Sequence, residues 1–187
     1  MTSSYRPARG RFLVSEPFMA DANFQRTVVL LVEHNDEGSL GFVLNRTMEV
    51  SLGELVPGLD VPGVPVLLGG PVENTTLHYI HRFSDLDGAR EVVPGVYWSG
   101  DFEQLKVWSR QGILTPENII FVVGYSGWGA GQLDAELDRK SWIVAPASET
   151  LVFGASQNEQ DLWRDVLQTL GERYKIISNY PTDPRLN

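Results

Sequence analysis

The sequence contains no cysteine. Disulfide bonds, thiolate nucleophiles, cysteine-ligated zinc and iron–sulfur clusters are therefore excluded together. A chain without cysteine also fits the cytoplasm, where thiols are kept reduced and disulfides are rare. Chemistry in this protein has to come from oxygen, nitrogen and aromatic side chains.

Long apolar segments are missing as well. An apolar run such as residues 28–32 is far too short to cross a bilayer. The first eleven residues are polar and basic, and they are not followed by the apolar core of a signal peptide. We therefore expect a cytoplasmic protein that has no contact with the membrane.

Positive charge is scarce, because 15 Lys and Arg residues face 24 Asp and Glu residues, for a net charge of −9. Non-specific DNA binding depends on clustered Lys and Arg side chains that neutralise phosphates. The one basic cluster is Arg6, Arg9 and Arg11, and we expect residues 1–9 to form a flexible, solvated tail. The sequence also lacks a helix-turn-helix pattern. Direct nucleic-acid binding is not expected.

Histidine occurs only three times, at His34, His78 and His81. His78 and His81 are three residues apart in a predicted strand, so their side chains should point to opposite faces. A zinc site without cysteine would need all three histidines or additional carboxylates. We expect no metal and no other cofactor, and we expect His34 and His81 at the surface or at strand ends.

What the sequence does contain is typical of one globular domain. It has 187 residues, of which 42% are apolar and 21% are charged. We find no internal repeat and no linker, so residues 1–187 are expected to form a single domain.

Strand patterns come early in the chain, mostly in hairpin spacing, and helical patterns concentrate in the second half. This order favours an α+β fold with a mixed, largely antiparallel sheet and a few helices. Predicted strands cover residues 12–15, 27–34, 40–45, 66–68, 76–83, 96–98, 119–123 and 142–146. Predicted helices begin near residues 51, 101, 132 and 156, and Gly171 ends the last of them.

The glycine-rich residues 124–131 are the strongest sign of a site. They follow an apolar strand pattern and precede a helical one, which is where backbone N–H groups can face a ligand. The chemistry stays open, because the segment matches neither the phosphate-loop nor the dinucleotide-binding pattern. Either a less standard anion or nucleotide site lies here, or the glycines let a helix pack tightly on a strand.

Two kinds of function use residues of this segment. In a binding protein, Tyr125 and Trp128 would stack on a ligand or partner, and Arg46 would contact an anion. In an enzyme, Ser126 or His78 would carry the chemistry. The nucleophile-elbow pattern fails, because Trp128 stands where that pattern needs glycine. We therefore favour a binding protein over an enzyme.

Five ordered segments, spread over most of the chain from Gly10, carry a resemblance to a known family. They are residues 10–17, 24–34, 38–46, 69–72 with His78, and 124–137 read through to Trp142. Taken together, they resemble the bacterial AlgH/YqgE family.

The resemblance implies a single-domain α+β fold whose bifurcated sheet curls into a pseudo-barrel. The family's name carries a role in transcriptional regulation of alginate synthesis, but the family has no established biochemical activity and no assigned catalytic residues. The resemblance therefore implies a ligand- or partner-binding regulatory protein whose small-molecule or protein partner is unknown. Its recurrent motifs map onto Asn45, Arg46, Gly69, Gly70, Pro71, His78, Tyr125, Ser126, Gly127, Trp128, Gln132 and Glu136.

Overall fold

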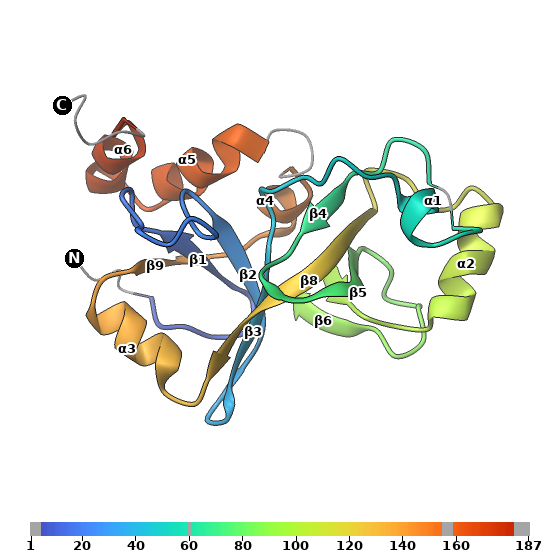
Figure 1. Ribbon diagram of the computed structural model, residues 1–187, viewed down its shortest axis with the longest axis horizontal. Coiled ribbons are helices and arrows are strands. Elements are labelled where there is room, and N and C mark those ends of the chain that lie inside the picture. Colours follow the sequence, from blue (N-terminus) through green and yellow to red (C-terminus); the bar gives the residue numbers. More distant parts are fainter. Residues whose placement is uncertain (1–4, 60, 155–158, 182–187) are drawn as a thin grey trace.

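The computed structural model describes residues 5–59, 61–154 and 159–181. Within these residues it is an α+β fold built on one mixed, mostly antiparallel sheet in the order β6-β7-β5-β8-β3-β2-β1-β9, with β4 pairing to β8 beside this path (Figure 1). The strands are β1 (Arg11–Ser15), β2 (Val28–Asn35), β3 (Gly38–Val43), β4 (Val66–Leu68), β5 (Val72–His81), β6 (Arg90–Val93), β7 (Val96–Trp98), β8 (Ile119–Gly129) and β9 (Trp142–Pro146). The helices are α1 (Leu52–Leu55), α2 (Phe102–Arg110), α3 (Gln132–Asp138), α4 (Glu149–Gly154), α5 (Glu159–Thr169) and α6 (Glu172–Ser178).

The long strand β8 joins the two parts of the sheet (Figure 1). One edge of β8 pairs antiparallel with β5. The other edge pairs first with β4, in parallel, and then with β3, antiparallel. Strand β4 lies between β8 and the segment that follows β3, because its residue Leu67 also forms a β-bridge with Thr47. The sheet divides at this point. The expected bifurcated, curled sheet is therefore confirmed.

Between β4 and β5 the chain has to cross over β8, because these two strands pair with opposite edges of it. Gly69 and Gly70 make the crossing. A Cβ atom on Gly69 would lie 2.4 Å from the carbonyl oxygen of Gly124, and one on Gly70 would lie 2.3 Å from that of Tyr125. Two residues without side chains are therefore a steric requirement of this topology.

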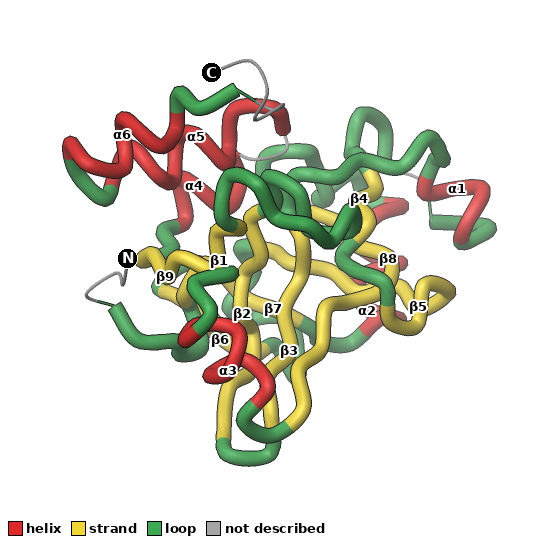
Figure 2. The backbone as a smooth tube through the Cα atoms, turned by 60° about the vertical axis from the view of Figure 1, so that its left-hand side comes forward, coloured by secondary structure: helices red, strands yellow, loops and turns green. Residues whose placement is uncertain are grey.

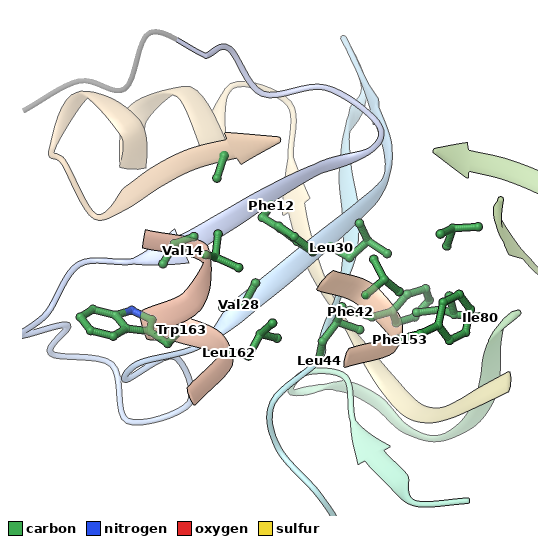
Figure 3. Close-up of a cluster of buried hydrophobic side chains, with 14 of the residues drawn as sticks. Phe12, Val14, Val28, Leu30, Phe42, Leu44, Ile80, Phe153, Leu162 and Trp163 are labelled. Atoms are coloured by element: carbon green, nitrogen blue, oxygen red, sulfur yellow. The ribbon is translucent and has the colours of Figure 1, made fainter. Parts of the chain in front are cut away.

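Three apolar layers cover the two faces of the sheet. The largest lies between the concave sheet and α4, α5 and α6, and Figure 3 shows Phe12, Leu30, Phe42, Phe153 and Trp163 within it. Helices α1 and α2 cover a second layer over β4, β5 and β8, and α3 covers a third over β1, β2 and β9. Figure 2 shows α4, α5 and α6 gathered at one end of the molecule, apart from α3.

The cap patterns read from the sequence are confirmed. Ser51 and Glu54 form a capping box at α1, and the side chain of Asp101 accepts a hydrogen bond from the backbone N–H of Gln104 at 2.9 Å. The N-cap expected near Ser156 lies outside the described residues.

The structure corrects several boundaries. Residues 124–129 are not a loop but the second half of β8, which continues alongside β3. Gly124 adopts a left-handed conformation (φ 69°) where the register with β5 shifts, and the extra residues of that shift lie in β5 between Val72 and Leu77. The helix predicted to end at Gly171 does end there, because α5 stops at Thr169, but it is not the last helix, since α6 follows Gly171. Strand β6 and helices α4 and α6 are additional elements, and β5 begins at Val72 rather than at residue 76.

Residues 5–9 of the expected tail carry no helix or strand. None of the helices in the described part of the chain is both long enough and apolar enough to span a membrane.

The crossing over β8 can be tested by adding one methyl group. Gly69→Ala should lower the free energy of unfolding by roughly 2–3 kcal/mol, because its Cβ has to displace backbone atoms. Gly129→Ala is the matched control in β8, since a Cβ there meets nothing within 4 Å, and it should change stability by less than about 0.5 kcal/mol. Urea unfolding of both variants measures the difference, and equal stabilities would show that the crossing is not tight.

Candidate functional site

Most residues predicted as site candidates gather around the second half of β8. Gly69, Gly70 and Pro71 cross over the strand there. The strand itself carries four of the candidates, and α3 follows directly after it. The residues placed together in this region are Gly69, Gly70, Pro71, Tyr125, Ser126, Gly127, Trp128, Gln132 and Glu136.

A cleft of about 380 Å³ opens between this half of β8, α3 and the loop that joins β1 to β2. We call it the indole cleft, because Trp128 and Trp142 form part of its wall. Its other lining residues come from the β1–β2 loop, the crossing segment and α3. They are Met19, Asp21, Phe24, Pro71, Val72, Gly127, Gln132, Glu136, Arg139 and Ser141.

The carboxylate of Glu136 organises this cleft. Its Oε2 atom accepts hydrogen bonds from the indole N–H groups of Trp128, at 2.9 Å, and Trp142, at 2.8 Å. Its Oε1 atom accepts a hydrogen bond from the side-chain amide of Gln132 at 3.0 Å. The other end of that amide accepts from the backbone N–H of Gly129, so α3 is fixed to the end of β8.

Tyr125 and Trp128, both expected to stack on a ligand or partner, lie on different faces of β8. The Trp128 ring packs in the layer under α3 and is only 5% exposed. The half-buried Tyr125 ring packs in the concave layer, where its centroid lies 6.1 Å from that of His78. Tyr125 and Trp128 are three residues apart in one strand, and this odd spacing sends their rings to different faces.

Ser126 has a structural hydrogen bond. Its side chain is 1% exposed, and its Oγ donates to the carbonyl oxygen of Gly69 at 3.0 Å. This bond ties β8 to the crossing segment. The nucleophile that the enzyme hypothesis would need is therefore buried and already engaged with the backbone.

Asn45 and Arg46 lie where β3 ends, close to the start of β2. Asn45 is 5% exposed; its Oδ1 accepts from the N–H of Val28 at 2.9 Å, and its Nδ2 donates to the carbonyl of Arg26 at 2.8 Å. The Asn45 side chain therefore links the end of β3 to the start of β2. Arg46 donates to the carbonyl of Gln25 and lines a different cleft, to which we return below.

His78 and His81 point to opposite faces of β5, as predicted. The His78 ring lies among aromatic rings, 4.9 Å from Phe42 between centroids, and its buried Nε2 has no hydrogen-bond partner. Of the two positions predicted for His81, the strand end is confirmed, because His81 is the last residue of β5, and the surface is wrong, because this side chain is fully buried. Its Nε2 lies 2.7 Å from the carbonyl of Ser99, and its Nδ1 accepts from the N–H of Phe83. That pair of contacts fixes the neutral form that carries its proton on Nε2.

Burial lowers the pKa of both histidines. For His78 the nearby Glu73 opposes this shift, and for His81 the hydrogen bond to Ser99 opposes it. Within the described ranges, no group of three or more His, Asp or Glu side chains is arranged to hold a metal ion.

Sequence patterns did not identify Phe24 and Trp142 as partners in the cleft. Phe24 lies in an irregular loop, and its ring contacts that of Trp142 edge to face with centroids 5.3 Å apart. Trp142 begins β9, far along the chain from Phe24. Only the pairing of β1 with both β2 and β9 brings them together, so no local signal marked them.

The central role of Glu136 gives a direct test. Glu136→Ala should lower the free energy of unfolding by about 2 kcal/mol, because two indole N–H groups lose their shared acceptor. Asp138→Ala, on the exposed side of the same helix, should cost less than about 0.5 kcal/mol. Chemical unfolding of the two variants provides the comparison, and equal losses would mean that Glu136 contributes only as a surface residue.

The buried histidines predict a dependence of stability on pH. Because their pKa values are lower in the folded than in the unfolded chain, unfolding takes up protons as the pH falls below 6.5, the ordinary pKa of histidine. Stability should be fully retained above that pH and should decrease between about pH 6.5 and about pH 5. The lowered pKa values of Glu54 and Glu117 matter only at lower pH, near the ordinary glutamate pKa of 4.5.

Urea unfolding at about pH 7 and about pH 5 measures this effect. His78→Phe, which fills the aromatic surroundings with a ring that cannot titrate, should show a smaller loss than the wild type. Wild-type stability that stays constant over this range would contradict the assignment of neutral, buried histidines.

Comparison with known proteins identifies the family to which the chain is similar. A family model described as AlgH-like matches residues 12–175. A UPF0301 protein from Chlorobium luteolum is 42% identical over 183 residues, covering 97% of this chain and 96% of the relative. A UPF0301 protein from Bacteroides thetaiotaomicron is 35% identical over 182 residues, covering 97% and 92%.

Solved structures agree with this placement. The solution structure of the AlgH protein from Pseudomonas aeruginosa has a TM-score of 0.73 and 28% identity, and the match covers 97% of this chain and 98% of that one. A crystal structure from Corynebacterium diphtheriae has a TM-score of 0.77 at 24% identity, covering 94% of each chain, and shows the same fold. The chain belongs to the AlgH-like family.

Proposed function

We propose that this protein is a binding module that takes a small molecule, or a side chain of a partner, in the indole cleft, and that Glu136 is the group that recognises it. The observation that carries the proposal is a carboxylate held in place by three N–H donors inside a cleft with aromatic walls. Such a group has a fixed direction before any ligand arrives, which lowers the entropic cost of binding.

The hydrogen bonds of Glu136 indicate what the ligand has to supply. An ionised carboxylate can accept about four hydrogen bonds, two on each oxygen. Oε2 already accepts two and Oε1 accepts one, which leaves one acceptor position on Oε1. None of the ion pairs among the described residues includes Glu136. A neutral N–H donor of a ligand would fill the free position, and an ammonium or guanidinium group would also balance the charge.

The rest of the cleft supports a ligand with an apolar body. Met19, Phe24 and Pro71 line it beside the indoles, so a ring or an aliphatic chain would lose contact with water there. Asp21 adds a second carboxylate and Arg139 adds a cation. Amines, donor-bearing heterocycles such as nucleobases, and lysine or arginine side chains of a partner share the required chemistry.

We place the regulatory role that the family's name carries at the level of binding, and we place the protein in the cytoplasm. With a net charge of −9, the chain is poorly suited to direct contact with nucleic acid. A ligand in the indole cleft would contact α3 and the β1–β2 loop together, so it could change the surface that these segments offer to a partner.

The alternative of an enzyme has less support. Ser126 is hydrogen-bonded to Gly69, and His78 lies among aromatic rings in the concave layer. A serine–histidine pair for nucleophilic catalysis is not assembled from these two residues. Turnover of any substrate that His78→Ala abolishes would reverse this judgement.

A thermal-shift screen tests the binding proposal. Amines, nucleobases, amino acids and short basic peptides are the compounds to compare. A ligand at a hundred times its Kd should stabilise the protein by about 2.7 kcal/mol and raise the Tm by roughly 5–10 °C. Glu136→Gln should remove this shift, whereas Asp138→Asn, which makes the same charge change on the exposed side of α3, should keep it. Failure of all these compounds, or hits unaffected by Glu136→Gln, would contradict the proposal.

A further inference from the structure

A second cleft, of about 440 Å³, is lined by residues from both ends of the β1–β2 loop. We call it the arginine cleft. Its residues come from that loop, from the entry to β2 and from the end of β3, and they include two arginines but no Asp or Glu. They are Pro17, Phe18, Met19, Ala20, Gln25, Arg26 and Arg46.

Neither arginine has a carboxylate partner among the described residues. The ion pairs of that part of the chain involve Arg82, Arg90, Lys106 and Lys175 instead. Arg26 donates from Nη2 to the carbonyl of Tyr180, and Arg46 donates from Nη2 to the carbonyl of Gln25. These backbone oxygens accept hydrogen bonds but carry no net charge to balance the guanidinium groups.

Arg26 is held firmly despite this lack of a counter-charge. Its backbone has a positive φ of 50°, which is uncommon for a residue with a side chain, and the amide of Asn45 fixes its carbonyl oxygen. Its guanidinium lies over the Trp163 ring, 4.6 Å from the centroid. Its Nε is buried and has no hydrogen-bond partner within residues 5–59, 61–154 and 159–181. Leaving a buried donor of a charged group without an acceptor costs free energy. A bound ligand that supplies an acceptor near this guanidinium would offset that cost.

The charges around Arg26 also favour a bound anion. Burial, together with the nearby Arg164, lowers the pKa of Arg26. Arg164 itself donates from Nε to the carbonyl of Ser178. This acidic protein therefore concentrates positive charge at one place, where an anion would relieve the mutual repulsion.

We propose that the arginine cleft binds a small organic oxyanion, a phosphate monoester or a carboxylate, between the guanidinium groups of Arg26 and Arg46. Arginine presents its N–H donors as a planar fork that matches both kinds of anion. Phe18, Met19 and Pro17 line the same cleft and would contact the organic part of the ligand. This site is distinct from the indole cleft and does not rest on the function proposed for it.

Calorimetric titration with phenyl phosphate and with benzoate tests this proposal on the full chain, with phenol and benzamide as neutral counterparts. Wild-type protein should bind at least one of the two anions and neither neutral compound. Binding of phenyl phosphate alone would identify a phosphate site, and binding of both anions would identify a general oxyanion site. Equal binding of anions and neutral compounds, or binding of none, would overturn the proposal.

Variants show whether the arginines are responsible. Arg46→Gln should raise the Kd for the anion about tenfold or more, because a charge-assisted hydrogen bond is lost. Arg46→Lys keeps the charge but not the fork, so it should restore part of the affinity. Arg110→Gln makes the same charge change at an exposed position of α2 and should leave the Kd within about twofold of the wild type.

Arg26→Gln should also weaken binding, but it removes the contact with Trp163 as well, so its folding has to be checked by circular dichroism. Because Arg46 has no such packing partner, Arg46→Gln decides the question even if the Arg26 variant is unstable. An unchanged Kd in Arg46→Gln overturns the proposal. Glu136→Gln should leave anion binding intact, which separates this result from the fate of the indole cleft.

Discussion

The close approach of Gly69 and Gly70 to the backbone of β8 is the constraint on which the rest of the structure depends. It allows the chain to pass from one edge of β8 to the other, so that β4 can lie where the sheet divides and β5 can pair on the far side. The hydrogen bond from Ser126 to Gly69 and the left-handed conformation of Gly124 belong to the same crossing. Two glycine-containing segments far apart in the sequence therefore have one steric cause.

The candidate residues fall into two groups: those that the fold itself requires and those whose polar groups are available for binding. Asn45, Gly69, Gly70 and Ser126 have their polar groups or their space fully used by the backbone around them. Glu136 and Arg46 are different, because each carries a charge that no ion pair of the described residues neutralises. The two clefts share Met19 and lie along the same β1–β2 loop, so ligands of opposite charge would be held by neighbouring parts of one segment.

Much of the fold could be predicted from the sequence, because strand alternation and helix caps are local signals. Residues 28–32 alternate between two apolar layers in a strand paired on both edges, as their pattern predicts. The second half of β8 could not be predicted, since a glycine-rich segment after a strand has the same sequence pattern whether the strand ends or continues. The strand continues here because residues 126–129 pair with β3. Likewise, Glu136 could be found from a motif, but its contacts with Trp128 and Trp142 could not. Nor could the placement of Arg26 and Arg46 in one cleft, because only the fold brings these residues together.

The central position of β8 also has a consequence for biosynthesis. β8 begins only at Ile119, after its partners β3, β4 and β5 have been synthesised. Until it emerges from the ribosome, β3 has one unpaired edge, β4 has no partner strand, and β5 can pair only with β7. The nascent chain therefore passes through a stage with exposed strand edges, which is when aggregation competes with folding. Pairings over such long stretches of sequence also make folding slow, so this stage lasts long enough for chaperones to act on it.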